Sequence, residues 1–273
     1  MPCTSIYLFL LLILLSPLGG RAQTSMEGGA RASALGGANT ALTHEVSAFA
    51  NPAAWATLSG RAVSFSATEA FGLSELRLGA VEYAEPTRLG TFAGGARTFG
   101  FDQYRETHFH AGYARGFRLD TSRRFSAGLF LRYQRVSIPN YGHTATLGLG
   151  LGGLVDVLPS VRVGFTAANL MVSSLSGREK LARSFSIGLA YLPVEGLLVV
   201  ADVLKEKAFP FSIRAGLEVQ PVPAFFLRVG ATTEPTRFTA GAGVRLGKLV
   251  ADLAGEHHEV LGWSPAVSFG LRW

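Results

Sequence analysis

Cysteine and charged residues are scarce in this sequence, and each scarcity excludes a class of protein. The 273 residues include one cysteine, Cys3, so a scaffold held by intramolecular disulfides is excluded. Only 16% of the residues are charged and 48% are hydrophobic, the opposite of a disordered chain. The net charge is +6, but the basic residues are spread singly, so no basic cluster points to a nucleic-acid partner.

Long apolar runs are also missing, apart from one at the start of the chain. Residues 6–15 are apolar without interruption, but a bilayer span needs about 20 residues. Pro17 follows, and then Gly20-Arg21-Ala22 places small residues before a cut after Ala22. This layout predicts a secretory signal peptide, residues 1–22, whose removal lowers the net charge by one. The alternative is a retained membrane anchor; a lipoprotein is not indicated, because Cys3 precedes the apolar run.

The remaining apolar residues alternate with small or polar ones. In the clearest segment Phe125, Leu129 and Leu131 alternate with Ser126, Gly128 and other residues. Segments 211–220, 238–246 and 267–273 repeat this period of two. Successive side chains of a strand point to opposite faces, so each segment predicts a strand with one apolar face.

Fourteen such segments follow one another with short connections. Most prolines fall at or beside their boundaries, as expected for a residue that cannot donate to a ladder. The predicted strands are 61–68, 73–84, 87–98, 104–117, 123–136, 142–155, 160–168, 182–192, 196–204, 209–220, 224–232, 236–246, 248–256 and 264–273.

This pattern predicts an all-β protein, an antiparallel up-and-down transmembrane β-barrel of about 14 strands over residues 60–273. Closure removes the two edges that an open sheet would leave. A soluble barrel would need an outward face rich in Lys and Glu, whereas the second face here carries Gly, Ser, Thr and Arg. A soluble β-sandwich or propeller is the alternative. The predicted location is the bacterial outer membrane, with its lipid as a partner.

The turns of this barrel divide into two sets if both termini are periplasmic. Short turns near 156–160, 192–196, 220–224 and 247 fall on the periplasmic side. Longer connections near 100–103, 137–141, 170–181 and 256–263 fall outside, as expected for such barrels.

The last strand carries a further signal. Phe269, Leu271 and Trp273 share one face, and Trp273 ends the sequence. A final strand that ends in an aromatic residue resembles the sorting signal of bacterial outer-membrane barrels. The resemblance implies the barrel-assembly machinery as a partner.

The segment before the barrel, residues 23–59, does not alternate. It is rich in Ala and Gly, and it contains Asn51, Pro52 and Ala53. A 14-stranded barrel has a lumen wider than its own side chains fill. We therefore expect this segment to plug the lumen, with a short helix at residues 41–48.

Several short motifs in this region resemble one superfamily, that of the long-chain fatty-acid outer-membrane transporters and the PorV/PorQ family linked to type IX secretion. They are Gly29-Ala30-Arg31-Ala32, Leu35-Gly36-Gly37-Ala38 and Asn51-Pro52-Ala53. The family pattern continues with Gly-Leu, where this chain has Ala54 and Trp55. Ala168-Asn169-Leu170 and residues 183–193, 211–223 and 264–273 are similar to the PorV/PorQ branch, although this chain is shorter than usual.

Motifs for catalysis or metal binding are absent from the sequence. There is no Gly-x-Ser-x-Gly elbow and no P-loop, and the glycines of 148–153 lie inside a predicted strand. His108 and His110 share a strand face, but two histidines make a weak metal site. His257 and His258 fall in a predicted outer loop. We expect no enzyme activity, no catalytic residue, no metal and no cofactor.

Charged residues are expected on the lumenal face of the last strands. Arg214, Arg228 and Arg245 lie on consecutive strands, with Glu218 and Asp252 on the same or neighbouring ones. They could attract an anionic head group such as a carboxylate. The favoured interpretation is a lumenal network that satisfies itself and holds the plug, because the acids are close.

Two functions therefore remain open. The PorV/PorQ resemblance implies a non-enzymatic accessory of protein secretion that docks a translocon or its cargo. The transporter resemblance implies a passive conduit for long-chain fatty acids or other hydrophobic small molecules, with an apolar pocket beside the plug and a lateral opening at a kinked strand. The first is favoured on overall resemblance.

Overall fold

Strands account for most of the protein. A computed structural model describes residues 28–44, 46, 51–120, 123–176, 182–207 and 209–273, so the predicted signal peptide lies outside the described residues. The strands are β1 (Ala62–Glu69), β2 (Arg77–Thr87), β3 (Gly90–Phe101), β4 (Tyr104–Arg118), β5 (Arg124–Ile138), β6 (Gly142–Leu158), β7 (Val161–Ala168), β8 (Val172–Ser176), β9 (Ser184–Tyr191), β10 (Leu197–Glu206), β11 (Phe211–Val222), β12 (Phe225–Thr233), β13 (Thr236–Leu246), β14 (Leu249–His258) and β15 (Gly262–Arg272).

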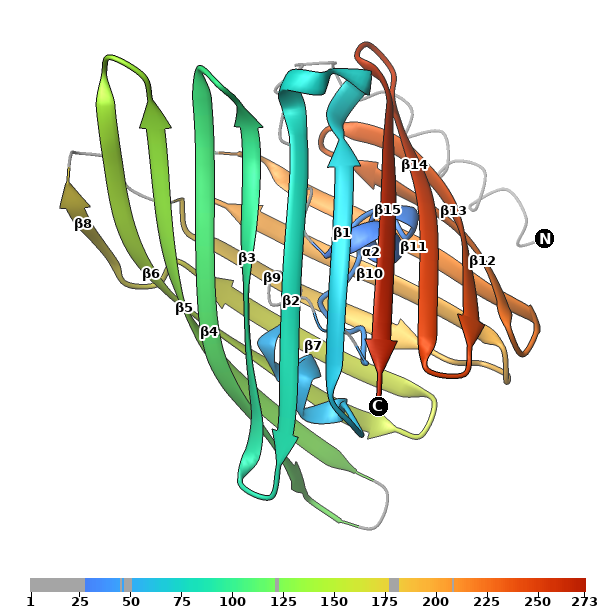
Figure 1. Cartoon of the computed structure of the whole chain (residues 1–273). Coiled ribbons are helices and arrows are strands. Elements are labelled where there is room, and N and C mark those ends of the chain that lie inside the picture. The colour runs from blue at the N-terminus through green and yellow to red at the C-terminus, as the bar shows by residue number, and fades with distance from the viewer. Residues whose placement is uncertain (1–27, 45, 47–50, 121–122, 177–181, 208) are drawn as a thin grey trace.

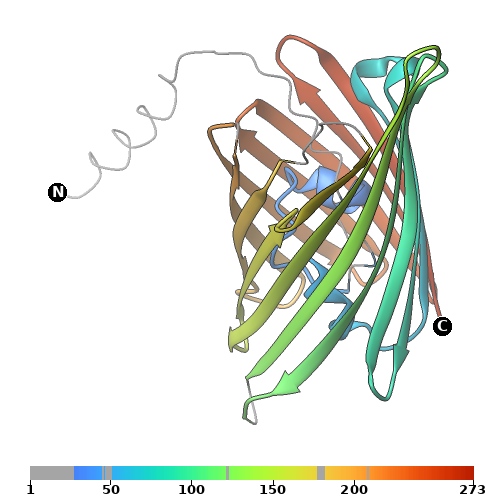
Figure 2. The same ribbon diagram turned by 90° about the vertical axis from the view of Figure 1, so that its left-hand side faces the viewer.

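These strands form a single closed sheet. Neighbours along the chain pair antiparallel except at β8, and β1 pairs with β15, where Phe65 lies opposite Phe269. β7 and β8 both pair with β6, so together they make one interrupted strand of the wall. The result is a closed 14-stranded antiparallel barrel (Figure 1, Figure 2), which confirms the predicted fold and excludes a sandwich or propeller.

The two faces of the wall differ as the alternation predicts. Large apolar side chains point outward, among them Ile187 and Phe238, which are 65% and 63% exposed. The lumenal face is small or polar, and it includes buried Arg132 and Thr239. Outward apolar side chains suit lipid rather than water. No helix in the described part of the chain is long and apolar enough to cross a membrane.

The strand boundaries agree closely with the sequence, with two differences. The connection from β1 to β2 contains two short 3-10 turns, η2 (Ala70–Gly72) and η3 (Ser74–Leu76). Residues 172–176, predicted to belong to an outer loop, form β8. Both differences lie at the end of the barrel opposite to the C-terminus (Figure 1).

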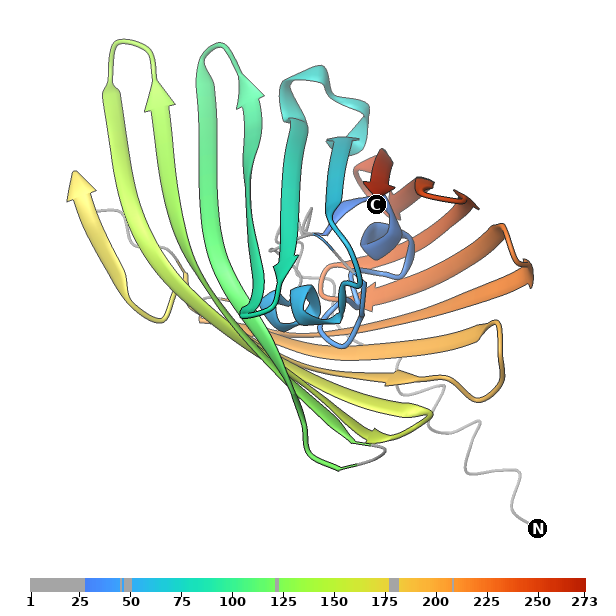
Figure 3. The same ribbon diagram turned by 60° about the horizontal axis from the view of Figure 1, so that its bottom comes forward.

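Residues 28–44, 46 and 51–58 lie inside the barrel, and we call them the lumenal segment. It contains the helix α2 (Gly29–Ala34) and the 3-10 helix η1 (Pro52–Thr57). Figure 3 looks toward the bottom of the barrel in Figure 1 and shows both helices enclosed by the strands.

The short helix expected at 41–48 is wrong for the residues that the structure describes. His44 has a φ of 58°, which a right-handed helix does not allow. The carbonyl groups of Thr40, Thr43 and His44 accept hydrogen bonds from side chains instead of from a following helical turn. Side-chain donors from elsewhere in the molecule therefore override the local preference of this alanine-rich stretch.

Trp55 forms the core of the lower half of the lumen. Its side chain is fully buried, and its indole N–H donates to the carbonyl of Val46 at 2.9 Å. It packs in one cluster with alanines of the wall, including Ala62, Ala84 and Ala93. Larger side chains at these positions would occupy the space of the indole ring. The tryptophan thus fills the volume that these short side chains leave.

Candidate functional site

The barrel wall approaches the lumenal segment at a row of glycines. A Cβ at Gly152 would lie 2.1 Å from Oδ1 of Asn51, and one at Gly230 would lie 2.3 Å from the backbone N of Gly36. Neither position can hold a larger side chain without moving the segment. Similar close approaches occur on four other strands, at Gly128, Gly164, Gly188 and Gly216.

Asn51 ties the segment to two strands of the wall. Its amide N donates to the carbonyls of Thr40 at 2.7 Å and Gly153 at 3.1 Å, and contacts that of Phe165 at 3.3 Å. Its Oδ1 accepts from the N–H of Ala53 and caps η1, whose first residue is Pro52. Asn51 therefore joins both halves of the segment to β6 and β7.

Ala54 does not disturb this arrangement. It stands where the resembling families carry glycine, and it lies inside η1 without a positive φ. A right-handed 3-10 turn needs no glycine. The Asn51-Pro52-Ala53 conformation is therefore compatible with the alanine.

Side chains of the wall also hold the α2 half of the segment. Asp202 accepts from the N–H groups of Asn39 at 2.8 Å and Thr40 at 2.9 Å. The hydroxyl oxygens of Ser268 and Thr239 accept from the N–H groups of Ala30 and Gly36. The hydroxyls of Thr239 and Thr232 donate to the carbonyls of Ala34 and Gly36. Such partners satisfy backbone groups that a helix as short as α2 leaves unpaired at its ends.

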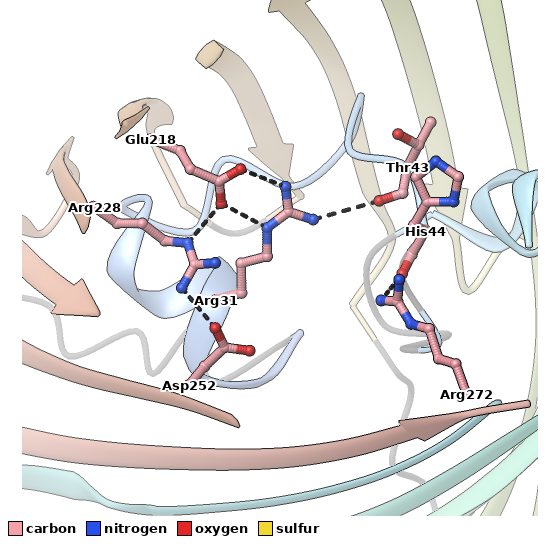
Figure 4. Close-up of polar contacts among 7 residues, drawn as sticks. All are labelled: Arg31, Thr43, His44, Glu218, Arg228, Asp252 and Arg272. Carbon is pink, nitrogen blue, oxygen red and sulfur yellow. Dashed lines mark hydrogen bonds and ion pairs between the residues drawn. The ribbon is translucent and has the colours of Figure 1, made fainter. Parts of the chain in front are cut away.

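A buried ion network joins α2 to the wall (Figure 4). Arg31 donates to both carboxylate oxygens of Glu218, at 2.8 and 2.9 Å. Arg228 donates to Glu218 at 2.6 Å and to Asp252 at 2.7 Å. The Arg228 side chain is 3% exposed. Two guanidinium groups and two carboxylates are thus matched in charge inside the lumen.

Three of the five charged residues singled out in the sequence meet in this network, and two do not. Arg228, Glu218 and Asp252 are bonded directly. Arg214 donates to the carbonyl of Gly37 at 3.2 Å. The Arg245 guanidinium lies 4.9 Å from the centre of the Phe226 ring. The five therefore do not form one ladder, and Arg31 replaces Arg214 and Arg245 as the second cation.

Arginines also surround the turn at His44. Arg272 donates to the His44 carbonyl at 2.7 Å (Figure 4). Arg162 donates to the Thr43 hydroxyl at 3.1 Å. Desolvation, followed by the positive charges of nearby arginines, lowers the pKa of the His44 imidazole to about 4. These arginines are Arg272, Arg31, Arg162 and Arg245. His44 is therefore neutral near pH 7.

The wall is irregular where β7 becomes β8. The chain takes five residue steps from Ala167 to Val172, while its partner β6 takes three from Gly148 to Leu151. Asn169 absorbs the excess with a left-handed φ of 58°. Asparagine adopts this region more readily than most residues. The outcome is a kink in the strand.

Beyond the kink, the wall loses one pairing. β9 pairs with β7 as far as Ser184 opposite Ala168, while β8, among the described residues, pairs with β6 alone. Figure 1 shows β8 beside β6 and apart from β9. Between described residues at this point, the Asn169 amide donates to the carbonyl of Ala182 at 2.8 Å. The described strands thus leave an interruption between β8 and β9.

A small pocket, of about 30 Å³, lies on the lumenal side of this interruption. It is bounded by the wall near the kink, by residues 39 and 40, and by Pro52 of the lumenal segment. Its lining is mixed in character and includes Phe130, Arg132, Leu151, Ala168, Ser184 and Leu204. The interruption, the pocket and the Asn51-Pro52 turn are therefore neighbours.

The histidines do not assemble a metal site. His108 lies 3.1 Å from a Glu106 oxygen, and His110 lies 3.8 Å from a Glu82 oxygen, all on the lumenal face. Across the described residues, no group of three or more His, Cys, Asp or Glu side chains converges as a metal would require.

His257 and His258 are placed differently from the prediction of a loop. They end β14, where they lie opposite Trp263 and Gly262. The His257 ring lies 4.8 Å from the Trp263 ring, and the His258 ring packs edge-on against Phe71. Both rings therefore make packing contacts at the rim.

The C-terminal residues lie on the outer face. Phe269 and Leu271 are 53% and 43% exposed, and the Trp273 N–H donates to the carbonyl of Arg61 at 3.0 Å. The Trp273 ring lies 6.4 Å from that of Tyr83. Aromatic side chains thus gather at this end of the barrel, as at a membrane interface.

Sequence reasoning missed three features of this site. Arg31 appeared only within a motif, because its partner Glu218 is 187 residues away. Asp202 was not singled out, although it is an acid at an inward position of an alternating strand. The transporter resemblance implies a kinked strand but does not give its position, although Asn169 lies in a motif noted for its resemblance.

Comparisons with known proteins agree on the fold. No protein-family model matches the sequence, and no curated protein matches it. Solved structures do match. The monoaromatic hydrocarbon channel CymD has a TM-score of 0.67 at 13% identity, over 92% of this chain and 99% of its own.

Two further solved structures are similar. The Ralstonia pickettii toluene transporter TbuX has a TM-score of 0.65 at 14% identity, over 92% of this chain and 100% of its own. A Pseudomonas aeruginosa FadL homologue has a TM-score of 0.57 at 12% identity, over 92% and 98%. At these identities the likeness establishes a shared barrel fold.

Proposed function

We propose that this protein is an outer-membrane channel for hydrophobic small molecules, and that they leave its lumen sideways between β8 and β9. The interruption of the wall beside a lumenal pocket is the observation that carries this proposal. The shared fold with a hydrocarbon channel and a toluene transporter supports it. The transporter hypothesis is thereby favoured over the secretion hypothesis.

The lumenal segment explains why the exit would be lateral. It packs closely against glycines of six strands, and Trp55 fills the lower lumen. A straight path to the far end of the barrel would require this segment to move away from its bonds with the wall. An apolar molecule that reaches the pocket has a shorter path to lipid through the interruption, and lipid is the solvent that it prefers.

The membrane location follows from the outer surface. Its apolar band and its aromatic side chains near Trp273 suit the hydrocarbon layer and its interface. We propose the bacterial outer membrane, with export by the predicted signal peptide and both barrel termini on the periplasmic side. β8 and the kink then belong to the outward half of the wall.

The secretion role of PorV/PorQ type remains a prediction. It needs a docking surface for a translocon or its cargo, and no observation identifies one. Its specific test is co-purification of a large partner from the native host with the full chain in mild detergent.

Uptake by whole cells tests the channel. Radiolabelled toluene and oleate would be supplied to a bacterial host that lacks its own fatty-acid channel and expresses this protein. We expect faster uptake than in cells with an empty vector. Ala168→Phe places a ring in the pocket and should return uptake to the vector level.

Ala215→Phe is the matched control, because Ala215 is an alanine on the outer face of β11. It should keep full uptake. Uptake at the vector level for both probes with wild-type protein at normal surface abundance would contradict the proposal. So would equal uptake by wild-type protein and the Ala168→Phe variant.

A further inference from the structure

A shallow groove lies on the outer surface of the barrel, away from the lumen. It runs over β15, β1, β2 and β3, which face the viewer in Figure 1, near the end where β1 turns into β2. Its outward-facing lining is mostly apolar or small and includes Ala67, Gly79, Thr98, Gly100, Pro265 and Val267. All of these residues are described, and none contributes to the lumenal site.

The register of the sheet explains the groove. Val267, Ala67, Gly79 and Thr98 lie opposite one another in one row across four strands. Short side chains in such a row leave a hollow in a surface that otherwise carries large apolar groups. At Gly79 an added Cβ would meet only the Thr98 methyl group, at 3.9 Å.

Large side chains form the flanks of this hollow. Phe65, two residues before Ala67, is 54% exposed, and Leu253, opposite Val267, is 60% exposed. The groove therefore has the shape and the apolar lining that an extended hydrocarbon chain requires.

Three arginines stand at the outward end of the groove. The side chains of Arg77 and Arg105 are 65% and 56% exposed. Arg135 is also exposed, and it lies diagonally across from Arg105, within reach of a long side chain. Such a cluster, directly above an apolar groove, fits a ligand that is apolar with an anionic end.

Two carboxylates compete for this cluster, but weakly. Glu69 pairs with Arg77 at 2.8 Å, and Asp102 pairs with Arg105 at 3.2 Å. Exposed pairs of this kind are weak because water and salt screen them. Arg135 has no carboxylate partner in the described part of the chain. A phosphate, which binds guanidinium groups in a bidentate way, can therefore replace the carboxylates.

We propose that this groove binds a phosphorylated lipid of the outward leaflet, of the lipid A type, with an acyl chain in the hollow and a phosphate at the arginines. The arginines and the groove lie at the outward end of a surface that faces lipid, so a lipid is favoured over a soluble anion as the ligand. The inference rests on the proposed membrane orientation, but not on what the lumen transports.

Lipid binding by the purified full chain tests the proposal. The protein would be delipidated in mild detergent, mixed with diphosphoryl lipid A or phosphatidylethanolamine, and analysed by native mass spectrometry. We expect lipid A to bind at least about tenfold more tightly than phosphatidylethanolamine, because only its phosphates lack a neutralising amine. Equal binding of the two lipids would overturn the proposal.

Variants separate the two parts of the site. Arg77→Gln with Arg105→Gln removes the charge, and Gly79→Leu fills the hollow; each should weaken lipid A binding at least about tenfold. Arg115→Gln, an exposed arginine near the other end of β4, is the matched control and should bind normally.

Folding and transport provide the remaining controls. Heat-dependent migration on gels would verify that each variant is folded, and Ala67→Leu replaces Gly79→Leu if that variant fails. Unchanged lipid A binding by the folded charge variant and by the folded groove variant would refute the site. Uptake of toluene should be normal in all of these variants. Lipid binding therefore tests the groove proposal, and uptake tests the channel proposal separately.

Discussion

Arg31 of α2 and Glu218 of β11 are joined by two parallel hydrogen bonds of 2.8 and 2.9 Å. The same carboxylate also accepts from Arg228, so one acid serves two cations. Bidentate pairs of this kind fix geometry as well as energy. Glu218 is therefore the central residue of the link between the lumenal segment and the wall.

Glu218→Gln should destabilise the barrel substantially. The change removes the carboxylate that Arg31 and Arg228 share, so the buried Arg228 keeps only Asp252 as a charged partner. Removing one partner of a buried pair costs about 3–5 kcal/mol. Urea unfolding in lipid vesicles would measure the loss. The control is Glu85→Gln, since the partly exposed Glu85 pairs with the exposed Arg61 on the surface, and that change should leave the midpoint unaltered.

Asn51 and Gly152 should behave as a coupled pair. Gly152→Ala places a Cβ 2.1 Å from the side-chain Oδ1 of Asn51, so it should displace the lumenal segment. Asn51→Ala alone should cost about 1–3 kcal/mol, because it leaves buried backbone groups without partners. The double variant should lose less stability than the two single losses added together, because Asn51→Ala removes the amide that the new Cβ would strike. Additive losses in a double-mutant cycle would show that the two do not touch.

The faces and number of the strands are predictable from the sequence because they depend on local alternation. Any slip by one residue would turn Phe125, Leu129 and Leu131 from lipid toward the lumen. That requirement acts on every strand, so the pattern is visible in each. The boundary errors are small for the same reason.

The kink and the lumenal bonds are less predictable because they depend on distant or unusual features. β8 was assigned to a loop, since neither glycine nor proline marks the two extra residue steps, and a left-handed Asn169 absorbs them. Arg31 and Asp202 find partners 187 and 163 residues away. Alternation identifies a charged side chain that points inward, but it does not identify the residue across the lumen that bonds to it.

Stability should depend on pH through His44. Its pKa in the folded protein is about 4, below the ordinary value of 6.5, so the folded state resists the proton that the unfolded state accepts. Its contribution is therefore fully present above pH 6.5 and lost as the pH falls toward 4. Nearby arginines are the main charged cause, so low salt should enlarge the effect.

His44→Gln removes this titration and keeps a polar side chain. The unfolding midpoint of the wild-type protein should fall more steeply from pH 6.5 to 4 than that of the variant, and the two should run parallel from pH 7 to 8. Carboxylates titrate in both proteins and cancel in the difference. Parallel curves over the whole range would mean that the arginines do not act on this imidazole.

Asn169 should determine both the shape of the kink and the rate of uptake. Its φ of 58° is unfavourable for most residues, by about 1–2 kcal/mol, and worst for a β-branched one. Asn169→Val should therefore drive the strand toward an extended backbone and favour pairing with β9, which would close the interruption. Uptake of toluene should fall, and amide hydrogens near Ala168 should exchange more slowly.

Asn169→Gly is the matched variant, because glycine adopts the same φ without strain. It loses only the bond to the Ala182 carbonyl, so the kink should persist and uptake should stay near the wild-type rate. Because the two variants differ in backbone preference, a difference between them reports on the strand rather than on the lost amide. Equal uptake by both would mean that hydrophobic molecules do not pass at the kink, and the exit would have to be sought through the lumenal segment instead.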